Sequence, residues 1–216
     1  MKTFNALVSG ASLLAMLAAS GASAQTLAEI EAAAKQEGML TTIALPHDWC
    51  NYGDIIAAFK AKYPEITVNE LNPDAGSADE LEAIRANKDN TGPQAPDVID
   101  VGLAFGPQAK DEGLIQPYKV STWDDIPADI KDADGFWAGA YYGVMALGVN
   151  TDIIQTLPTT WDDLLKADYA NAFALTGDPR ASNQAILAIM SAGVSRGAEP
   201  GEASGSKGLE FMAELN

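Results

Sequence analysis

The sequence predicts an α/β fold in which a parallel sheet is covered by helices on both sides. Two observations lead to this prediction. Between residues 26 and 113, short segments of strand character alternate with amphipathic helical segments. The segment 98–103 is also almost wholly apolar, as expected of a strand that is buried on both faces.

The first unit of this pattern is a helix followed by a strand. Thr26 can cap the helix, Glu29 three residues later completes a capping box, and Gly38 is a natural stop. Residues 39–45 are rich in Thr and Ile and predict the first strand. A polar and aromatic loop is expected over residues 46–53.

A second unit follows with the same order. Residues 54–63 predict a helix that Pro64 ends, and residues 66–71 alternate as a second strand. Ser77 and Glu80 then predict another capping box at the start of the next helix. The third unit consists of a strand and a short helix, expected over residues 98–103 and 106–112.

The pattern changes after residue 135. Segments 136–142 and 144–150 are apolar or aromatic strand material on either side of Gly143. The elements expected after them are a helix capped by Thr160, a short strand over 173–175, a helix from Ser182 to about Ala192, a Gly-rich link over 199–206 and a last helix up to Leu215. Because these residues supply too few strands for a finished sheet, we expect the chain to be a fragment that lacks a C-terminal portion.

The N-terminus has the layout of a cleavable secretory signal peptide over residues 1–24. Lys2 gives a positive start, an apolar run follows, and Ala22-Ser23-Ala24 places small side chains where a signal peptidase cuts. A membrane anchor is the alternative, but the run is short and rich in Ala, Ser and Gly. The mature chain is therefore expected in a bacterial periplasm.

Charge and composition narrow the function classes. The chain has 13 Lys and Arg against 30 Asp and Glu, a formal charge of -17, so its surface should repel nucleic acid and anionic lipid headgroups. We expect no nucleic-acid partner. Cys50 and His47 are the single cysteine and the single histidine, so neither an intrachain disulfide nor a zinc site of several His or Cys ligands can form. No metal site and no cofactor are expected.

Catalysis has one candidate pair, His47 and Cys50, because a thiolate beside an imidazole is a nucleophile. This pair lacks a third orienting group. The sequence also lacks a Gly-x-Ser-x-Gly elbow, a phosphate loop and a dinucleotide fingerprint. We therefore expect a protein that is not an enzyme, and a secreted thiol-dependent enzyme remains the alternative.

Ligands of an open parallel sheet bind beyond the carboxyl ends of its strands. Four segments occupy such positions: 47–49, 75–77, 104–106 and 178–183. The predicted ligand-binding residues are His47, Asp48, Trp49, Ser77, Phe105, Tyr142, Ser182 and Asn183.

Each of these residues also has a purely structural interpretation. Both serines can simply cap helices. His47 can pair with Asp48, and Phe105 can belong to the core. Tyr141 and Tyr142 alternate on a predicted strand, so at most one of them faces a cleft.

Several motifs, in this order, resemble those of the extracellular solute-binding proteins of bacterial ABC importers, in the branch of iron, polyamine, thiamine and phosphonate binders. The motifs are a helix that ends Ala-Lys-Gln-Glu-Gly, then Ala-Pro-Asp-Val at 95–98, Gly-Leu-Ile-Gln-Pro-Tyr at 113–118, Tyr-Gly at 142–143 leading to Gly-Val-Asn-Thr at 148–151, Pro-Thr-Thr-Trp-Asp-Asp-Leu-Leu at 158–165 and Asp-Pro-Arg at 178–180.

This resemblance implies a type II periplasmic-binding-protein fold with two lobes and a hinge. Lobe I would span residues 25–138, crossover strands 139–150 would form the hinge, and 151–216 would be an incomplete lobe II. The protein would bind a small solute between the lobes and deliver it to an ABC permease in the inner membrane, as a monomer when full length.

The resemblance leaves the solute open. His47 lies where some iron binders place a histidine, but their acidic ligand after the third strand has no counterpart in 102–105, and their tyrosine pair would fall beyond Asn216. Asp48, Trp49 and Tyr52 would suit an organic cation such as a polyamine or thiamine, through ring faces and a carboxylate. Ferric iron and a phosphonate remain alternatives.

Overall fold

The computed structural model describes residues 26–215, so the predicted signal peptide lies outside the described residues. The α-helices are α1 (Leu27–Glu37), α2 (Tyr52–Lys62), α3 (Ser77–Ala86), α4 (Phe105–Asp111), α5 (Asn183–Ser195) and α6 (Glu202–Leu215). The strands are β1 (Met39–Ile43) and β2 (Thr67–Leu71), and short 3₁₀ helices cover Trp123–Asp125, Ala128–Ile130, Trp161–Leu165 and Ala167–Tyr169. Among the helices of these residues, none combines the length and apolar character needed to cross a membrane.

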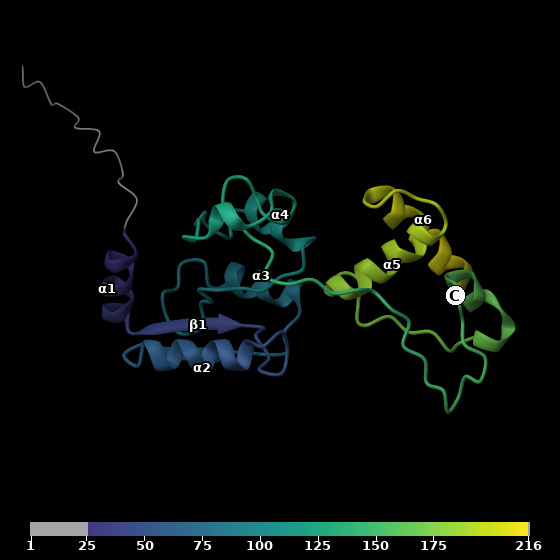
Figure 1. The fold of residues 1–216 in the computed structure, drawn as a ribbon, viewed down its shortest axis with the longest axis horizontal. Helices are drawn as coiled ribbons and strands as arrows, with labels where there is room; N and C mark the ends of the chain where they lie inside the picture. Colours follow the sequence, from purple (N-terminus) through teal and green to yellow (C-terminus); the bar gives the residue numbers. More distant parts are fainter. Residues whose placement is uncertain (1–25, 216) are drawn as a thin grey trace, which may run out of the picture.

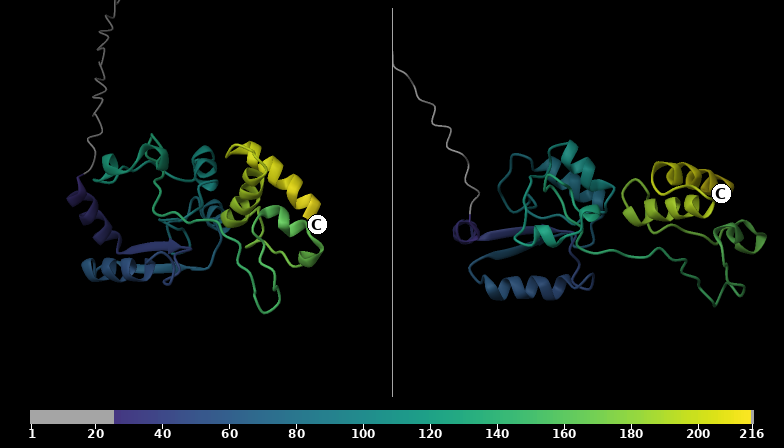
Figure 2. Two further views of the ribbon diagram at one scale, coloured as in Figure 1. Left: turned by 45° about the vertical axis from the view of Figure 1, so that its right-hand side comes forward. Right: turned by 45° about the horizontal axis from the view of Figure 1, so that its top comes forward.

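The described elements form two groups (Figures 1 and 2). The N-terminal group contains the sheet and helices α1 to α4. The C-terminal group contains α5, α6 and the 3₁₀ helices of residues 161–169. An extended segment without regular structure, residues 139–150, crosses from one group to the other, as the right-hand view of Figure 2 shows.

The sheet confirms the first two predicted strands. β1 and β2 pair in parallel, with Met39 opposite Thr67 and Ile43 opposite Leu71. Figure 1 shows α2 on one side of β1 and α3 on the other. This is the helix–strand–helix layering that the alternating pattern predicts.

The third predicted strand, 98–103, is wrong. Only Thr42 and Val98 form an isolated bridge, and Leu103 is 64% exposed. The physical reason is a competing set of hydrogen bonds. The Asp97 carboxylate accepts from the Thr41 backbone N–H at 2.7 Å, and beyond it the main chain of 100–102 is held by side chains of α3.

Helix capping is confirmed at three of the four sites where Ser or Thr was expected to cap, namely Thr26, Thr160 and Ser182. Thr26 and Glu29 form the expected capping box. Ser182 accepts from the Ala185 N–H and caps α5, which runs to Ser195. The capping box of Ser77 and Glu80 is wrong, because Gly76 is the N-cap and the Asp79 carboxylate accepts its N–H at 3.0 Å.

The C-terminal group departs further from the predicted strands. Segments 136–142, 144–150 and 173–175 are extended but join no ladder, and the sole bridge that they make among the described residues joins Lys131 and Ala138. Thr160 does cap the next turn, although that turn is a short 3₁₀ helix. α6 begins at Glu202, inside the predicted Gly-rich link.

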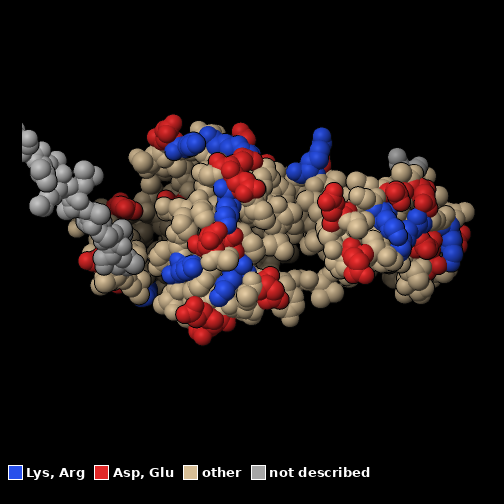
Figure 3. Space-filling model, turned by 90° about the horizontal axis from the view of Figure 1, so that it is seen from above, with Lys and Arg blue, Asp and Glu red and all other residues tan. Residues whose placement is uncertain are grey.

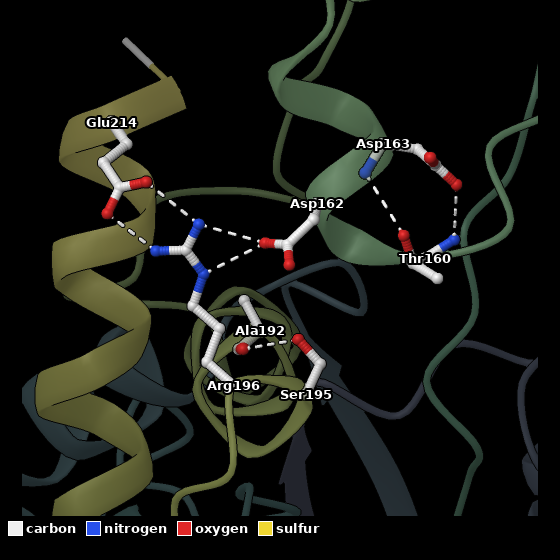
Figure 4. Close-up of polar contacts among 7 residues, drawn as sticks. All are labelled: Thr160, Asp162, Asp163, Ala192, Ser195, Arg196 and Glu214. Atoms are coloured by element: carbon white, nitrogen blue, oxygen red, sulfur yellow. Dashed lines mark hydrogen bonds and ion pairs between the residues drawn. The ribbon is translucent and has the colours of Figure 1, made fainter.

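A small core holds the C-terminal group together. Its fully buried centre is Phe211 on α6, against which Trp161 packs edge-on at a centroid distance of 5.8 Å. Arg196, at the end of α5, lies over the Phe211 ring at 4.8 Å. Its guanidinium donates to Asp162 and Glu214 at 2.7–3.1 Å (Figure 4), so one side chain ties the 3₁₀ turn and both helices together.

Candidate functional site

The loop after β1 turns sharply and presents aromatic side chains. Ala44, Cys50 and Asn51 adopt left-handed backbone angles, with φ of 58°, 44° and 65°. The Tyr52 N–H donates to the Trp49 carbonyl at 2.9 Å, and α2 begins there. The turn therefore brings the Trp49 side chain and the first side chain of α2 close to one another.

Two tyrosine hydroxyls reach the carboxylate of Asp100, and Trp49 bonds to one of them. The hydroxyls of Tyr52 and Tyr141 both donate to Asp100 Oδ2 at 2.9 Å. The Trp49 indole N–H donates to the Tyr141 hydroxyl at 3.0 Å. The Tyr141 ring meets both other rings edge-on, at centroid distances of 6.4 Å. We call Trp49, Tyr52, Asp100 and Tyr141 the aromatic–carboxylate cluster. Trp49 belongs to the loop after β1 and Tyr52 to α2. Asp100 follows Val98, which forms the bridge with Thr42, and Tyr141 belongs to the extended segment 139–150.

Both phenols of the cluster remain protonated at neutral pH. Burial raises the pKa of Tyr141 to about 12. Burial, together with the hydrogen bond to Asp100, also raises the pKa of Tyr52 well above its usual value. The two hydroxyls are therefore permanent donors to Asp100, and the negative charge of the cluster resides on that carboxylate.

Helix α3 fixes the main chain next to the cluster. The Asp100 N–H donates to Glu80 Oε2 at 2.8 Å, and the Gly102 N–H donates to Ser77 Oγ at 3.0 Å. Ser77 and Glu80 lie three residues apart and share one face of the helix. Because these bonds replace those of a sheet ladder, α3 determines the position of residues 100–102.

The same segment contacts the C-terminal group. A Cβ placed on Gly102 would lie 2.1 Å from the Cβ of Asn183, the first residue of α5, and one on Gly76 would lie 3.3 Å from the Ala181 carbonyl oxygen. Ile186, one turn further along α5, packs against the core of Leu81 and Phe105. The N-terminus of α5 therefore lies directly against the edge of the N-terminal group.

Three of the predicted ligand-binding residues lie in the aromatic–carboxylate cluster or at the contact around Gly102. Trp49 belongs to the aromatic–carboxylate cluster, whereas Ser77 and Asn183 meet at Gly102. Ser182 caps α5 and donates to the Thr176 carbonyl at 2.8 Å, so its cap role is confirmed. Their contact with a ligand stays a prediction.

The other predicted residues lie elsewhere. His47 bonds to Glu70, which Lys60 also binds, and not to Asp48, which is exposed. Phe105 is 6% exposed and belongs to the core, as its structural interpretation expects, and its contact with a ligand stays a prediction. Tyr142 is 93% exposed, and its neighbour Tyr141 takes the place in the cluster.

Sequence reasoning missed Asp100, the acceptor at the centre of the cluster. One signal was available, because Asp100 is the single charged residue in the otherwise apolar segment 98–103. A lone carboxylate in a buried segment needs partners, which makes it a candidate for function. The resemblance to iron binders places an acidic ligand at 102–105, after Asp100.

The charged side chains do not form a basic surface on the face seen in Figure 3. Acidic and basic residues are interspersed there over both groups, without a large patch of one sign. Within residues 26–215, no group of three or more His, Cys, Asp or Glu side chains is arranged to hold a metal ion.

Residues 94–215 match the family described as bacterial extracellular solute-binding proteins, and this match covers more than half of the chain. The chain belongs to this family. The match confirms the resemblance seen in the sequence at the level of an extracellular solute-binding protein.

A curated relative of this solute-binding protein carries a transporter name. It is the "Probable ABC transporter periplasmic-binding protein y4fP" of Sinorhizobium fredii (strain NBRC 101917 / NGR234), 30% identical over 119 residues. The matched region is 53% of this chain and 32% of the relative, so the chain spans about a third of the length of the relative it matches.

Proposed function

We propose that this solute-binding protein is periplasmic, holds a small solute between two lobes and delivers it to the permease of an ABC transporter in the inner membrane. Residues 25–138 would be lobe I, 139–150 the hinge and 151–216 part of lobe II. The observation that carries this proposal is the position of Asp100. Its carboxylate accepts from Tyr52 and Tyr141, and it lies two residues before Gly102, where α5 of the other group makes contact. A solute bound there would touch both lobes, which is what favours a closed state.

The chemistry of the cluster favours an organic cation over the other solutes. A carboxylate beside Trp and Tyr rings attracts an ammonium or thiazolium group through charge and ring faces. A polyamine or thiamine meets this description. A phosphonate would need a free basic group, yet the guanidinium of Arg180, the basic residue nearest the α5 N-terminus in sequence, donates to the Asp178 carboxylate at 2.5–3.1 Å through three bonds. Ferric iron would need several anionic ligands, and the cluster offers one.

The test is calorimetric titration of the purified protein with spermidine, thiamine, ferric citrate and 2-aminoethylphosphonate. Asp100→Asn keeps an oxygen that accepts from both tyrosines but removes the charge. We expect it to weaken binding of the cationic probe about 10- to 100-fold, the usual cost of losing a buried charged contact. Asp89→Asn, which removes an exposed carboxylate on a turn, is the matched control and should bind as the wild type does. Equal affinities of wild type and Asp100→Asn would contradict the assignment.

The alternative, a secreted enzyme that uses Cys50 and His47, makes a different prediction. The His47 ring is bonded to Glu70, and Cys50 is exposed. We therefore expect Cys50→Ser to change solute affinity by less than about twofold, because no hydrogen bond of the aromatic–carboxylate cluster involves the thiol. Titration of this variant beside the wild type measures the effect. A thiol-dependent hydrolytic activity that disappears in Cys50→Ser would favour the enzyme instead.

A further inference from the structure

Glu80 is a buried acid without a basic partner among the described residues. Its residue is 1% exposed, and its one hydrogen bond comes from the Asp100 N–H at 2.8 Å. The charged groups that face it are Asp79 on its own helix and Asp100 on the segment packed against α3, and both are acidic. A buried carboxyl group costs folding free energy unless it is paired. Helix capping does not explain why a glutamate is buried at position 80, because Gly76 and Asp79 form the cap of α3.

The position of Glu80 relates it to the candidate site. With Ser77, it supplies the two side-chain acceptors that hold the main chain of Asp100 and Gly102. The Asp100 side chain in turn accepts from Tyr52 and Tyr141. A shift of the Asp100 main chain would therefore move the carboxylate relative to both rings.

We propose that Glu80 is a positioning residue of the solute site, which fixes the Asp100 main chain and, by gaining or losing its own proton, adjusts the negative charge beside the Asp100 carboxylate. This proposal rests on the proposed function, because it assigns regulation to the same site. It makes binding of a cationic solute dependent on pH.

The sign of this dependence follows from the surroundings of Glu80. Burial raises the pKa of Glu80 to about 8. The hydrogen bond from the Asp100 N–H lowers this pKa, whereas the nearby carboxylates of Asp100 and Asp79 raise it further. Below that pH the group is neutral, and above it the group adds a negative charge next to Asp100. Cation affinity should therefore rise as the pH increases through 8. By linkage, a bound cation lowers the pKa of Glu80, so binding near pH 8 releases a proton.

A first experiment needs no solute. The fluorescence of Trp49, taken as the difference between wild type and Trp49→Phe, is followed from about pH 6 to about pH 9.5. We expect a transition with a midpoint near 8 in the wild type, because Trp49 is bonded through Tyr141 to Asp100. Glu80→Gln keeps the acceptor and removes the proton, so the transition should vanish. Glu82→Gln, on the same helix but exposed, should retain it. A wild type without the transition, or a Glu80→Gln variant that keeps it, would overturn the proposal.

A second experiment separates this proposal from the proposed function. Thiamine, which carries a permanent charge, is titrated into the same variants at about pH 6.5 and about pH 8.5. We expect the affinity of wild type and Glu82→Gln to rise about two- to fivefold over this interval, because ionised Glu80 adds one partly screened negative charge near the solute. The affinity of Glu80→Gln should stay constant. A rise that persists in Glu80→Gln overturns the proton link. If no probe binds at any pH while the Trp49 transition depends on Glu80, the proposed solute class fails and the positioning of Asp100 by Glu80 stands.

Discussion

Replacing Gly208 by alanine is expected to lower the free energy of unfolding by about 2–4 kcal/mol, the cost of overpacking a site that cannot relax. A Cβ on Gly208 would lie 1.9 Å from the Ile189 carbonyl oxygen and 2.6 Å from its carbonyl carbon. Both atoms belong to the backbone of α5, so no side-chain rotation can remove the collision. The helices would have to separate, and Phe211, on the same face one turn on, would lose its buried position. Urea unfolding followed by circular dichroism measures the change.

The same helix supplies the control. Gly205 lies three residues before Gly208, and a Cβ placed on it meets nothing within 4 Å. Gly205→Ala should therefore stabilise the protein by about 0.5–1 kcal/mol, since alanine loses less backbone entropy in a helix than glycine does. Gly193 on α5 is the reciprocal position, because its Cβ would lie 1.9 Å from the Ser204 carbonyl oxygen. If Gly208→Ala and Gly205→Ala were equally stable, the close crossing of α5 and α6 would be contradicted.

The helices were predictable because the signals that determine them are local. Thr26 with Glu29, and Ser182 before an apolar run, place their capping partners within one turn of chain. Local signals can also place a helix cap one residue away from its true position when two neighbouring pairs of residues fit the same capping pattern. Gly76 with Asp79 and Ser77 with Glu80 have the same spacing, and only the burial of Glu80 against Asp100 decides between them.

Strands beyond the first pair were not predictable, because a strand depends on a partner elsewhere in the chain. Segment 98–103 has the apolar composition of a buried strand, but the Asp97 side chain takes the Thr41 N–H and α3 takes the N–H groups of Asp100 and Gly102. Composition shows that a segment prefers burial. It does not show which donors and acceptors will compete for its backbone.

The candidate site divides in the same way. The positions of Trp49, Ser77 and Asn183 near this junction were predictable because residues that follow strands or start helices gather at one edge of a sheet. Asp100 was missed since its importance comes from two tyrosines that are 48 and 41 residues away in sequence. Phe105 was assigned to the site because it follows the predicted third strand, and its burial with Leu81 depends on packing that sequence position does not reveal.

The contact between the two groups of elements leads to the second prediction with a large effect. A methyl group on Gly102 would lie 2.1 Å from both Cβ and Cγ of Asn183. The Cβ atom is attached to the first residue of α5 and cannot move away without the helix. We expect Gly102→Ala to push α5 away from the N-terminal group and to weaken binding of a cationic solute at least about 10-fold, the loss usual when a contact needed for closure is misplaced.

The effect on folding should be smaller than that of Gly208→Ala. The core around Phe211 keeps its own packing, and the core around Leu81 keeps its buried residues and loses only the contact with Ile186 of α5. We expect the free energy of unfolding to fall by about 1–2 kcal/mol, since only the junction of the two groups is strained. Small-angle scattering should show a larger radius of gyration for Gly102→Ala than for the wild type, and this measurement does not depend on knowing the solute.

A compensating change makes the prediction specific to this pair of residues. Asn183→Gly removes the Cβ and Cγ that the new methyl group would strike, at a cost of about 1 kcal/mol or less for glycine in the first turn of a helix. The double variant should therefore recover the wild-type radius of gyration, with a coupling free energy of unfolding of at least about 1 kcal/mol in a double-mutant cycle. Gly76→Ala is the milder control, because its Cβ would lie 3.3 Å from the Ala181 carbonyl oxygen. Additive effects of Gly102→Ala and Asn183→Gly would mean that α5 does not rest on residue 102 in solution, and the closed arrangement proposed for the solute would then lose its structural basis.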